Sequence, residues 1–152
     1  MPIVTIIGSG MMGSALAFPA RENGNTVRLV GTPLDREIIN ACKETGKHPK
    51  LPLPFPAGVE YYQIEEVEKA LDGADMVIVN GENVSEGNGI MPDEADALLY
   101  SGVDVITGGN HIWQKNRIFS YLDDKNEILR PINFGDAAPG HGYAIVDGAG
   151  FR

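Results

Sequence analysis

Short apolar runs alternate with amphipathic stretches along most of the chain. The apolar runs are rich in β-branched residues, as is typical of strands buried on both faces of a parallel sheet. The stretches between them have helical spacing, and most end at a glycine. The predicted strands are 3–7, 26–30, 59–62, 76–79, 103–106, 128–131 and 143–146. The predicted helices are 11–23, 33–45, 64–71, 92–101 and 112–122.

This alternation predicts βαβ units and therefore an α/β fold with a doubly wound, mostly parallel, Rossmann-like sheet. We expect the strand order 3-2-1-4-5-6, with the strand at 143–146 as a further edge strand. The 152 residues suit a single domain. Thr32, followed by proline and an acid three residues on, predicts that the second helix begins directly after it.

Composition narrows the possible partners. The 43% hydrophobic and 22% charged residues indicate a globular protein, and the net charge of -9 argues against nucleic acid or an anionic membrane as the main partner. No run approaches the roughly 20 apolar residues of a membrane span, and the start does not resemble a signal peptide. Cys42 is the one cysteine, so we expect no intrachain disulfide and a cytoplasmic location. A homo-oligomer remains possible.

The first candidate site is a glycine motif between the first predicted strand and the first predicted helix. The G-x-G-x-x-G pattern supplies a tight turn, a close approach to a pyrophosphate and close packing of the helix on the strand. The amides at the helix start favour phosphate. The alternative is a tight turn without a ligand. The predicted cofactor-binding residues are Gly8, Ser9, Gly10, Met11, Met12 and Gly13.

The end of the second predicted strand bears on the choice of cofactor. No acid that could bind a ribose 2′-hydroxyl stands in the run from Leu29 to Thr32. Arg36 lies one helical turn beyond Thr32 and could meet a 2′-phosphate. The pattern therefore favours NADP over NAD, with Thr32 and Arg36 added to the predicted site. The alternative is that Arg36 is a solvated helix residue.

These features add up to a family resemblance. The stretch VTIIGSGMMGSALAFPARENGNTVRLVGTPLDREII, with GKHPKL after it, resembles the amino-terminal half of NAD(P)-dependent glycerol-3-phosphate dehydrogenases. The resemblance covers residues 3 to about 80 and implies an NAD(P)-binding fold. In that family the substrate site and the catalytic lysine come from later segments. We expect no counterpart of those segments in this chain.

A second resemblance covers residues from about 76 to 146. The segments VNGENVSEGNGI, GVDVITGGNHIWQK, LRPINF and APGHGYAIV resemble a bacterial metallophosphoesterase family that contains cyclic-nucleotide phosphodiesterases. The resemblance implies that Glu82, Asn83, Asn110 and His111 help to hold metal ions or phosphate. Carboxylate, amide and imidazole groups suit Mn, Fe or Zn, and paired metals can activate water.

This second site is expected to be partial. The first metal-binding aspartate of the family corresponds to Ser9, which is not a metal ligand of that kind. His48 and His141 are expected to be ordinary loop residues. Glu82 should also oppose phosphate binding at the glycine motif, because strands 1 and 4 are expected to be neighbours.

The two resemblances meet within residues 76–80. We therefore interpret the chain as a chimera, engineered or naturally recombined, of two phosphate-handling halves. The expected function is a scaffold without efficient catalysis, which binds a dinucleotide or another small phosphate-containing ligand weakly at most. One alternative is a metal-dependent phosphodiesterase. The other is an NAD(P)-binding subunit of a dehydrogenase that a partner protein completes.

Overall fold

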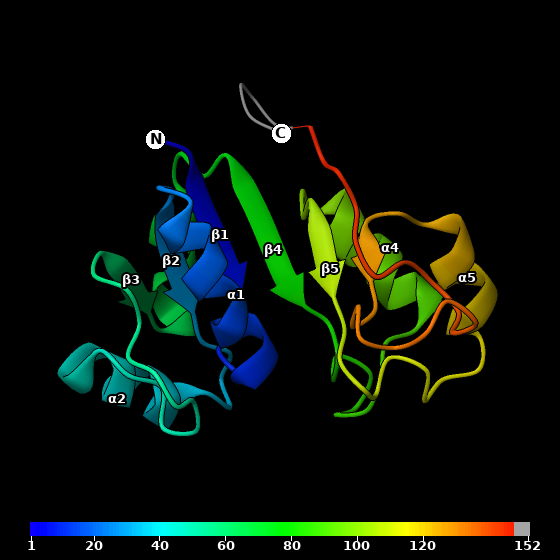
Figure 1. The fold of residues 1–152 in the computed structure, drawn as a ribbon, viewed down its shortest axis with the longest axis horizontal. Helices are drawn as coiled ribbons and strands as arrows, with labels where there is room; N and C mark the ends of the chain where they lie inside the picture. Colours follow the sequence, from blue (N-terminus) through cyan, green and yellow to red (C-terminus); the bar gives the residue numbers. More distant parts are fainter. Residues whose placement is uncertain (148–152) are drawn as a thin grey trace. The chain divides into compact units, whose positions relative to one another are not determined.

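The computed structural model describes residues 1–147 (Figure 1). Its six strands follow the order β3-β2-β1-β4-β5-β6, and the paired strands whose register is defined are parallel. The predicted α/β class and strand order are therefore confirmed. The elements are β1 Ile3–Ile7, α1 Met11–Glu22, β2 Thr26–Val30, α2 Arg36–Thr45, β3 Val59–Tyr62, the 3-10 turn η1 Ile64–Glu66, α3 Val67–Leu71, β4 Met76–Asn80, α4 Pro92–Tyr100, β5 Val105–Thr107, α5 Ile118–Asp124 and β6 Ile128–Leu129.

The chain divides into two compact units, which we describe separately. The amino-terminal unit spans Met1–Val77, and the carboxy-terminal unit begins at Ile78. β4 therefore contributes residues to both units. None of the helices described for residues 1–147 has the length and apolar character needed to cross a membrane.

In the amino-terminal unit, helices cover both faces of the strands. β1 pairs with β2 from Ile3 opposite Thr26 to Ile7 opposite Val30. The Thr5 hydroxyl donates to the carbonyl of Ala70 in α3 at 2.6 Å. Neighbouring side chains on a strand point to opposite faces, so the other face of β1 is left for α1, which Figure 1 shows lying across β1 and β2. The carboxyl ends of these strands carry the first candidate site.

The start of α2 differs from the prediction. The helix begins at Arg36, and Thr32 to Asp35 form a turn closed by the Asp35 amide, which donates to the Thr32 carbonyl at 2.9 Å. The Asp35 carboxylate also accepts hydrogen bonds from the Thr32 amide and hydroxyl. A short acidic side chain competes in this way with the helix for nearby backbone amides. Asp35, and not Thr32, is therefore the residue at the amino-terminal cap of α2.

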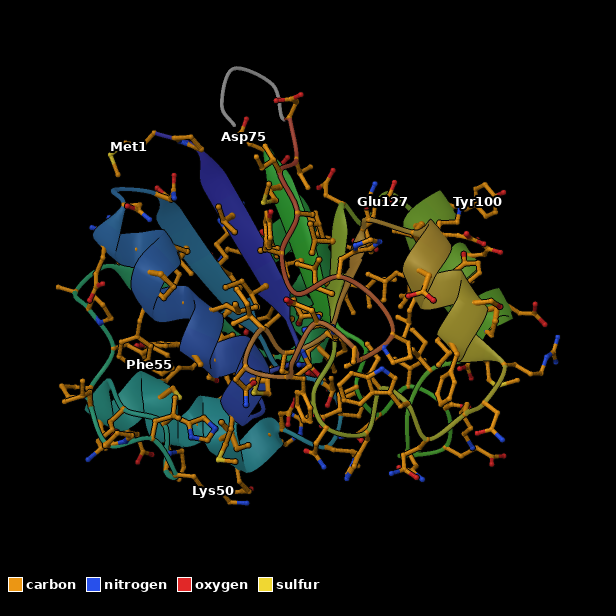
Figure 2. The ribbon with its side chains drawn as sticks, turned by 45° about the vertical axis from the view of Figure 1, so that its right-hand side comes forward. Met1, Lys50, Phe55, Asp75, Tyr100 and Glu127 are labelled. Carbon is orange, nitrogen blue, oxygen red and sulfur yellow. The ribbon has the colours of Figure 1, made fainter. Side chains whose placement is uncertain are left out.

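The proline-rich segment 47–57 is anchored to the core of the amino-terminal unit. The Phe55 amide donates to the Gly46 carbonyl at 2.8 Å. The Phe55 ring, labelled in Figure 2, stacks on Phe18 of α1 at 5.1 Å between centroids and meets Tyr61 of β3 at 5.6 Å. Aromatic pairs at these separations add to the free energy gained by burial. The segment is therefore a fixed part of this unit.

The carboxy-terminal unit is built around β4, β5 and β6. β5 pairs with β4 up to Asn80 opposite Thr107, and it pairs with β6 from Ile106 opposite Ile128. Packing of these strands against α4 and α5 gives a compact core. Its buried members are Ile90, Ala95, Ile106, Ile112, Ile118, Leu122 and Ile128.

Four predicted elements of this unit differ from the structure by two residues or more, and one of them is the strand predicted at 103–106, which is observed at Val105–Thr107. The predicted strand 143–146 is wrong: an isolated bridge joins His141 to Leu129, and the side chain of Tyr143 is 73% exposed. An alternating apolar pattern does not form a strand when no partner strand lies beside it. The predicted strand 128–131 ends at Leu129, two residues before Pro131, which has no amide hydrogen to donate to a neighbouring strand. The predicted helix 112–122 begins later, at Ile118.

Candidate functional site

The glycine motif forms an open helix start at the carboxyl end of β1. Gly8 has a φ of 103°, which favours glycine, and its amide donates to the Val30 carbonyl at 2.9 Å. Gly10 precedes α1, is exposed, and has nothing within 4 Å of the position of an added Cβ. The first turn of α1 contains no acidic residue. These features leave the amides and the positive end of the helix dipole open to an anion.

The side chain of Ser9, the second residue of the glycine motif, is turned inward. The residue is fully buried, and its Oγ atom has no hydrogen-bond partner among residues 1–147. The Ser9 amide donates to Asp35 Oδ2 at 3.2 Å, and its carbonyl accepts from Ser14 Oγ at 2.9 Å. The amide and the carbonyl of Ser9 are therefore both hydrogen-bonded to other residues of the unit.

Asp35 is a site residue that the sequence analysis missed. Its Oδ2 atom accepts three hydrogen bonds: from the Ser9 amide, from the Thr32 amide at 2.9 Å and from the Thr32 hydroxyl at 2.8 Å. A carboxylate thus reaches the end of β2, where no acid was expected. The available signal was the T-x-x-D spacing. That spacing is also typical of a helix start, and it was interpreted in that way.

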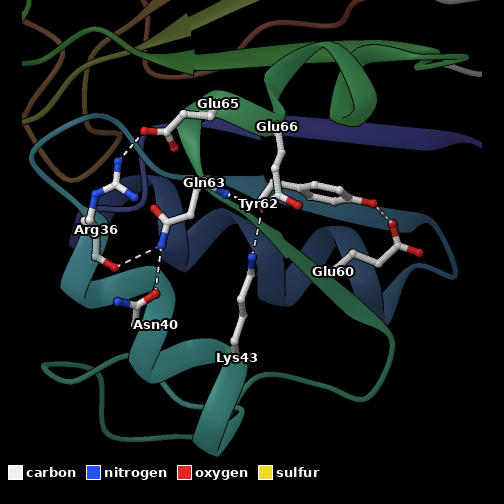
Figure 3. A network of polar contacts seen from close by, with 8 residues as sticks. All are labelled: Arg36, Asn40, Lys43, Glu60, Tyr62, Gln63, Glu65 and Glu66. Carbon is white, nitrogen blue, oxygen red and sulfur yellow. Dashed lines mark hydrogen bonds and ion pairs between the residues drawn. The ribbon is translucent and has the colours of Figure 1, made fainter.

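Arg36 has a protein partner, so it is not a free solvated residue. Its guanidinium pairs with the Glu65 carboxylate, as Figure 3 shows. The Gln63 side chain donates to the Arg36 carbonyl at 3.2 Å and to Asn40 at 2.9 Å. The Arg36 and Glu65 side chains are 51% and 59% exposed, and an ion pair of this kind is weak. A phosphate could therefore compete with Glu65 for Arg36.

His48 lies in a loop, as expected, but it is fully buried. Its Nδ1 atom accepts a hydrogen bond from the Lys50 amide at 3.0 Å. Burial lowers the pKa of His48. The Nε2 atom is buried without a hydrogen-bond partner among residues 1–147.

Three of the four predicted metal ligands converge in the carboxy-terminal unit. The His111 amide lies 3.4 Å from Glu82 Oε1, and His111 Nδ1 lies 2.9 Å from the Asn83 amide group. With its nitrogen turned toward His111, Asn83 also donates to the carbonyls of Gly87 at 3.0 Å and Glu82 at 3.2 Å. Asn110 is exposed. The structure thus groups Glu82, Asn83 and His111 beside the ends of β4 and β5.

A glycine makes room for this group. The Glu82 carboxylate lies so close to Gly109 that a Cβ there would overlap it. Nearby, Asn80 Nδ2 and Thr107 Oγ1 are buried without a hydrogen-bond partner among the described residues. The ends of the two strands therefore hold a compact polar cluster with unused hydrogen-bonding capacity.

The ligand set of this cluster suits one ion at most. Within residues 1–147, no three His, Cys, Asp or Glu side chains are placed to hold a metal together. A paired-metal site requires bridging carboxylates and further ligands. One carboxylate, one imidazole and an amide do not fit that requirement, so no step through paired metals follows from these residues.

A cavity of about 470 Å³ lies elsewhere in the carboxy-terminal unit. Its lining includes Arg130, His141 and Tyr143 and none of the predicted metal ligands. The Arg130 guanidinium is engaged with main-chain carbonyls, including those of Gly140 at 3.0 Å and Phe134 at 3.0 Å. The cation therefore holds the loop that forms the cavity wall.

The fold and the glycine loop define a Rossmann-like α/β protein whose two units carry different polar sites. Comparison with known families separates the units in the same way. Residues 3–83 belong to the family described as NAD-dependent glycerol-3-phosphate dehydrogenase N-terminus, and residues 59–151 belong to the family described as YmdB-like protein. Each match spans more than half of the chain, and the matches overlap at 59–83. Both predicted resemblances are confirmed, and the predicted junction at 76–80 lies within the overlap.

Curated relatives agree with this division. A 2′,3′-cyclic-nucleotide 2′-phosphodiesterase from Bacillus subtilis is 42% identical over 73 residues, which is 48% of this chain and 28% of that protein. An NADP(+)-dependent glycerol-3-phosphate dehydrogenase from Archaeoglobus fulgidus is 40% identical over 98 residues, which is 64% of this chain and 28% of that protein. The chain thus spans about 28% of the length of each of these relatives.

A solved glycerol-3-phosphate dehydrogenase from Coxiella burnetii shares the fold. It has a TM-score of 0.51 and 21% sequence identity, and the alignment covers 71% of this chain and 32% of that one. At this identity the likeness supports the Rossmann-like arrangement and nothing finer.

Proposed function

We propose that the protein is a chimeric, engineered Rossmann-like scaffold that binds the phosphates of a dinucleotide, or of another small phosphate-containing ligand, weakly at the loop Gly8 to Gly13. The observation that carries this proposal is the open start of α1 at the exposed Gly10, beside a first turn without acidic residues. Main-chain amides at such an end are suited to pyrophosphate. The match of residues 3–83 to a dehydrogenase amino terminus adds support.

Among the cofactors, the proposal favours NADP over NAD. Arg36 lies beyond the end of β2, and its exposed pair with Glu65 can be exchanged for a 2′-phosphate. Thr32 lies at the same strand end. Asp35 opposes this choice, because its carboxylate accepts hydrogen bonds at that end and would repel the phosphate. We expect the Arg36 attraction and the Asp35 repulsion to leave a small preference for NADP.

The proposal also holds that the protein does not catalyse hydride transfer or phosphodiester hydrolysis efficiently. Hydride transfer requires a substrate held against the nicotinamide together with a group that moves the hydroxyl proton. Ser9, which corresponds to the metal-binding aspartate of the phosphoesterase family, is a buried hydroxyl and supplies no charge to a metal. The group of Glu82, Asn83 and His111 has too few strong ligands for paired metals.

A second candidate function is weak metal binding followed by phosphodiester hydrolysis. It is favoured by the convergence of Glu82 and His111, and by the match to the YmdB-like family. Mn, Fe or Zn would be held by the Glu82 carboxylate, the His111 imidazole and the Asn83 amide. We expect such an ion to be removed readily by a chelator.

The remaining alternative is an NAD(P)-binding subunit that a partner protein completes. The proposal assigns the protein no nucleic-acid or membrane partner, because its net charge is -9. It assigns a cytoplasmic location from the lone cysteine, and it leaves a homo-oligomer open.

Calorimetric titration with NADPH, NADH and inorganic pyrophosphate tests the proposal. The informative variant is Gly10→Glu, because an added side chain there meets no atom within 4 Å and so should not disturb the fold. Its charge should repel the phosphates. Gly135→Glu in the other unit is a matched control, since its Cβ is equally unobstructed.

We expect weak binding by the wild type and by Gly135→Glu, and a loss of at least about tenfold in Gly10→Glu, from like charges within a few ångströms. Absence of binding by the wild type would overturn the proposal, as would unchanged binding by Gly10→Glu. Phosphodiester hydrolysis that requires Mn²⁺ and is lost in Glu82→Gln would instead establish the second candidate.

A further inference from the structure

Arg130 is a buried cation on the wall of the cavity in the carboxy-terminal unit. The residue is 8% exposed, and it lines the cavity together with His141. A guanidinium stays charged in proteins, and burial of a charge is costly unless the charge is hydrogen-bonded and paired. An anion that enters the cavity can therefore balance a positive charge on its wall.

The described hydrogen bonds of the Arg130 side chain use three of its five N–H groups. Nε donates to the Gly140 carbonyl at 3.0 Å, and Nη1 donates to the carbonyls of Pro131 at 3.2 Å and Phe134 at 3.0 Å. These carbonyls are neutral, so they satisfy donors without balancing the charge. The two hydrogens of Nη2 take no part in these bonds. Hydrogen bonds from a guanidinium to an anion are roughly twice as strong as neutral ones, so Nη2 is suited to an anionic oxygen.

His141 adds a hydrogen-bond acceptor to the same wall. Its Nε2 atom lies 3.0 Å from the Asp123 carbonyl, and a carbonyl only accepts, so Nε2 carries the ring hydrogen. In the neutral imidazole, Nδ1 is then an acceptor. The Arg130 amide donates to the His141 carbonyl at 2.9 Å, which fixes the two residues beside each other. The wall thus combines a cation with an acceptor.

A cation beside an acceptor selects a class of ligand. Phosphate compounds bring anionic oxygens for Arg130, and hydrogenphosphate or a hydroxylated phosphate ester also brings a hydroxyl that can donate to His141. Sulfate lacks that hydroxyl. The cavity volume of about 470 Å³ is in the range of pockets that take small molecules. Asp136 also lines the cavity and repels anions, but the residue is exposed, so solvent and salt screen its charge.

We propose that this cavity binds a small phosphate compound that carries a hydroxyl, with Arg130 Nη2 donating to an anionic oxygen and His141 Nδ1 accepting from the hydroxyl. Nε and Nη1 of Arg130 hold the cavity wall, and Nη2 binds the ligand. The site is separate from the loop Gly8 to Gly13 and does not depend on the function proposed for that loop.

NMR titration of the Gly10→Glu protein tests the proposal, because that variant is designed to remove phosphate binding at the glycine loop. The titrants are sodium phosphate, sodium sulfate and ribose 5-phosphate. At about pH 8, hydrogenphosphate and sulfate carry the same charge and differ by one hydroxyl hydrogen. The measured signals are the backbone amides of Gly142 and Tyr143, which line the cavity, and the Nε–H group of Arg130. Their shifts locate the site and give the dissociation constants.

Two further variants in the same background avoid replacing Arg130, which would release the loop that it holds. In His141→Gln the side-chain nitrogen can take the place of Nε2 and keep the bond to Asp123, whereas the acceptor at Nδ1 is lost. Asp136→Asn removes the carboxylate that lines the cavity. Asp124→Asn is its matched control, since it changes the net charge equally at an exposed residue outside the cavity lining.

We expect phosphate to shift the cavity signals and to bind about fivefold more tightly than sulfate, which corresponds to one hydrogen bond. In His141→Gln, phosphate should fall to the affinity of sulfate, and sulfate should bind as before. Asp136→Asn should bind both anions about two- to threefold more tightly, and Asp124→Asn should bind both as before.

Cavity signals that do not respond to phosphate would overturn the inference, as would equal affinities for phosphate and sulfate before residue 141 is changed. With the cavity signals responding, tighter binding of ribose 5-phosphate than of phosphate would identify an ester as the ligand, and the reverse order would identify free phosphate. Binding of NADPH at the glycine loop is measured on the wild type, so a failure of the proposed function would leave these results unaffected.

Discussion

The backbone amide of Ser9 donates a hydrogen bond to the Asp35 carboxylate at 3.2 Å, which joins the glycine loop to the residue just before α2. Ser9 is fully buried, so a larger or charged side chain there has no route to solvent. The same carboxylate also fixes the Thr32 turn. Loop geometry and the start of α2 therefore depend on one acidic group.

The first prediction follows from this contact. Ser9→Asp places a second carboxylate in a buried position beside Asp35, and an unpaired buried charge costs about 3–5 kcal/mol. We expect the free energy of unfolding to fall by at least about 3 kcal/mol in urea titrations.

A double-mutant cycle with Asp35→Asn identifies the cause of the destabilisation expected in Ser9→Asp. If repulsion between the two carboxylates is responsible, Ser9→Asp should be less costly in the Asp35→Asn background. Wild-type stability of the Ser9→Asp protein would show that Ser9 can turn outward. A cycle without coupling would assign the cost to burial alone.

The second prediction concerns cofactor choice. The Glu65→Gln substitution weakens the ion pair between residue 65 and Arg36. The exposed Arg36 guanidinium is then available to bind the 2′-phosphate. We expect NADPH to bind about two- to fivefold more tightly and NADH to bind as before, since an exposed ion pair contributes little. Calorimetry with both cofactors is the measurement. Lys43 pairs with Glu66 at 2.9 Å, so Glu66→Gln is a matched control that should change neither affinity.

The arrangement of the strands could be predicted because it depends on local patterns. The β-branched runs at 3–7 and 26–30 gave the bounds of β1 and β2, and parallel topology follows from their alternation with helices. The run at 143–146 has a similar pattern but lies outside a strand, because pairing needs a partner that the pattern does not reveal.

The site was less predictable because its contacts join distant parts of the chain. The glycine motif and the convergence of Glu82 with His111 could be inferred from strand ends. Asp35 could not, since its role depends on a contact with Ser9, which lies 26 residues away in sequence. Proline-rich composition predicts a loop at His48 and says nothing of its burial.

The third prediction tests the candidate metal group. In Gly109→Ala the new methyl group overlaps the Glu82 carboxylate and should push it aside. A flexible carboxylate can move, so stability should change by less than about 1 kcal/mol, whereas Mn²⁺ affinity should fall about tenfold, as in Glu82→Gln. Metal titration and urea unfolding of both variants check this. Normal Mn²⁺ binding by Gly109→Ala would exclude Glu82, in its observed position, as a ligand.

The fourth prediction is a pH dependence. Burial raises the pKa of the Cys42 thiol from 9.0 to about 11. A raised pKa means that the folded state holds the proton more tightly, so this contribution to stability is complete below pH 9 and is lost as the pH rises toward 11. At pH 8 we expect Cys42 to react with a disulfide reagent at least about 100-fold more slowly in the folded than in the unfolded protein. Equal rates with and without urea would contradict the buried position.

The last prediction concerns cooperativity between the two compact units. The sequence supplies one natural probe in each: Cys42 lies in the amino-terminal unit, and Trp113, the one tryptophan, lies in the carboxy-terminal unit. Trp113 packs edge-on against Phe134 at 4.7 Å and donates to the Pro139 carbonyl at 3.1 Å, so its fluorescence should change when that unit unfolds. β4 supplies residues to both units, so unfolding of one should remove part of a strand from the other. We therefore expect Cys42 labelling and Trp113 fluorescence to give the same urea midpoint, as for a single domain. Midpoints that differ by more than the error of the fits would show that the dehydrogenase-like and phosphoesterase-like parts unfold independently.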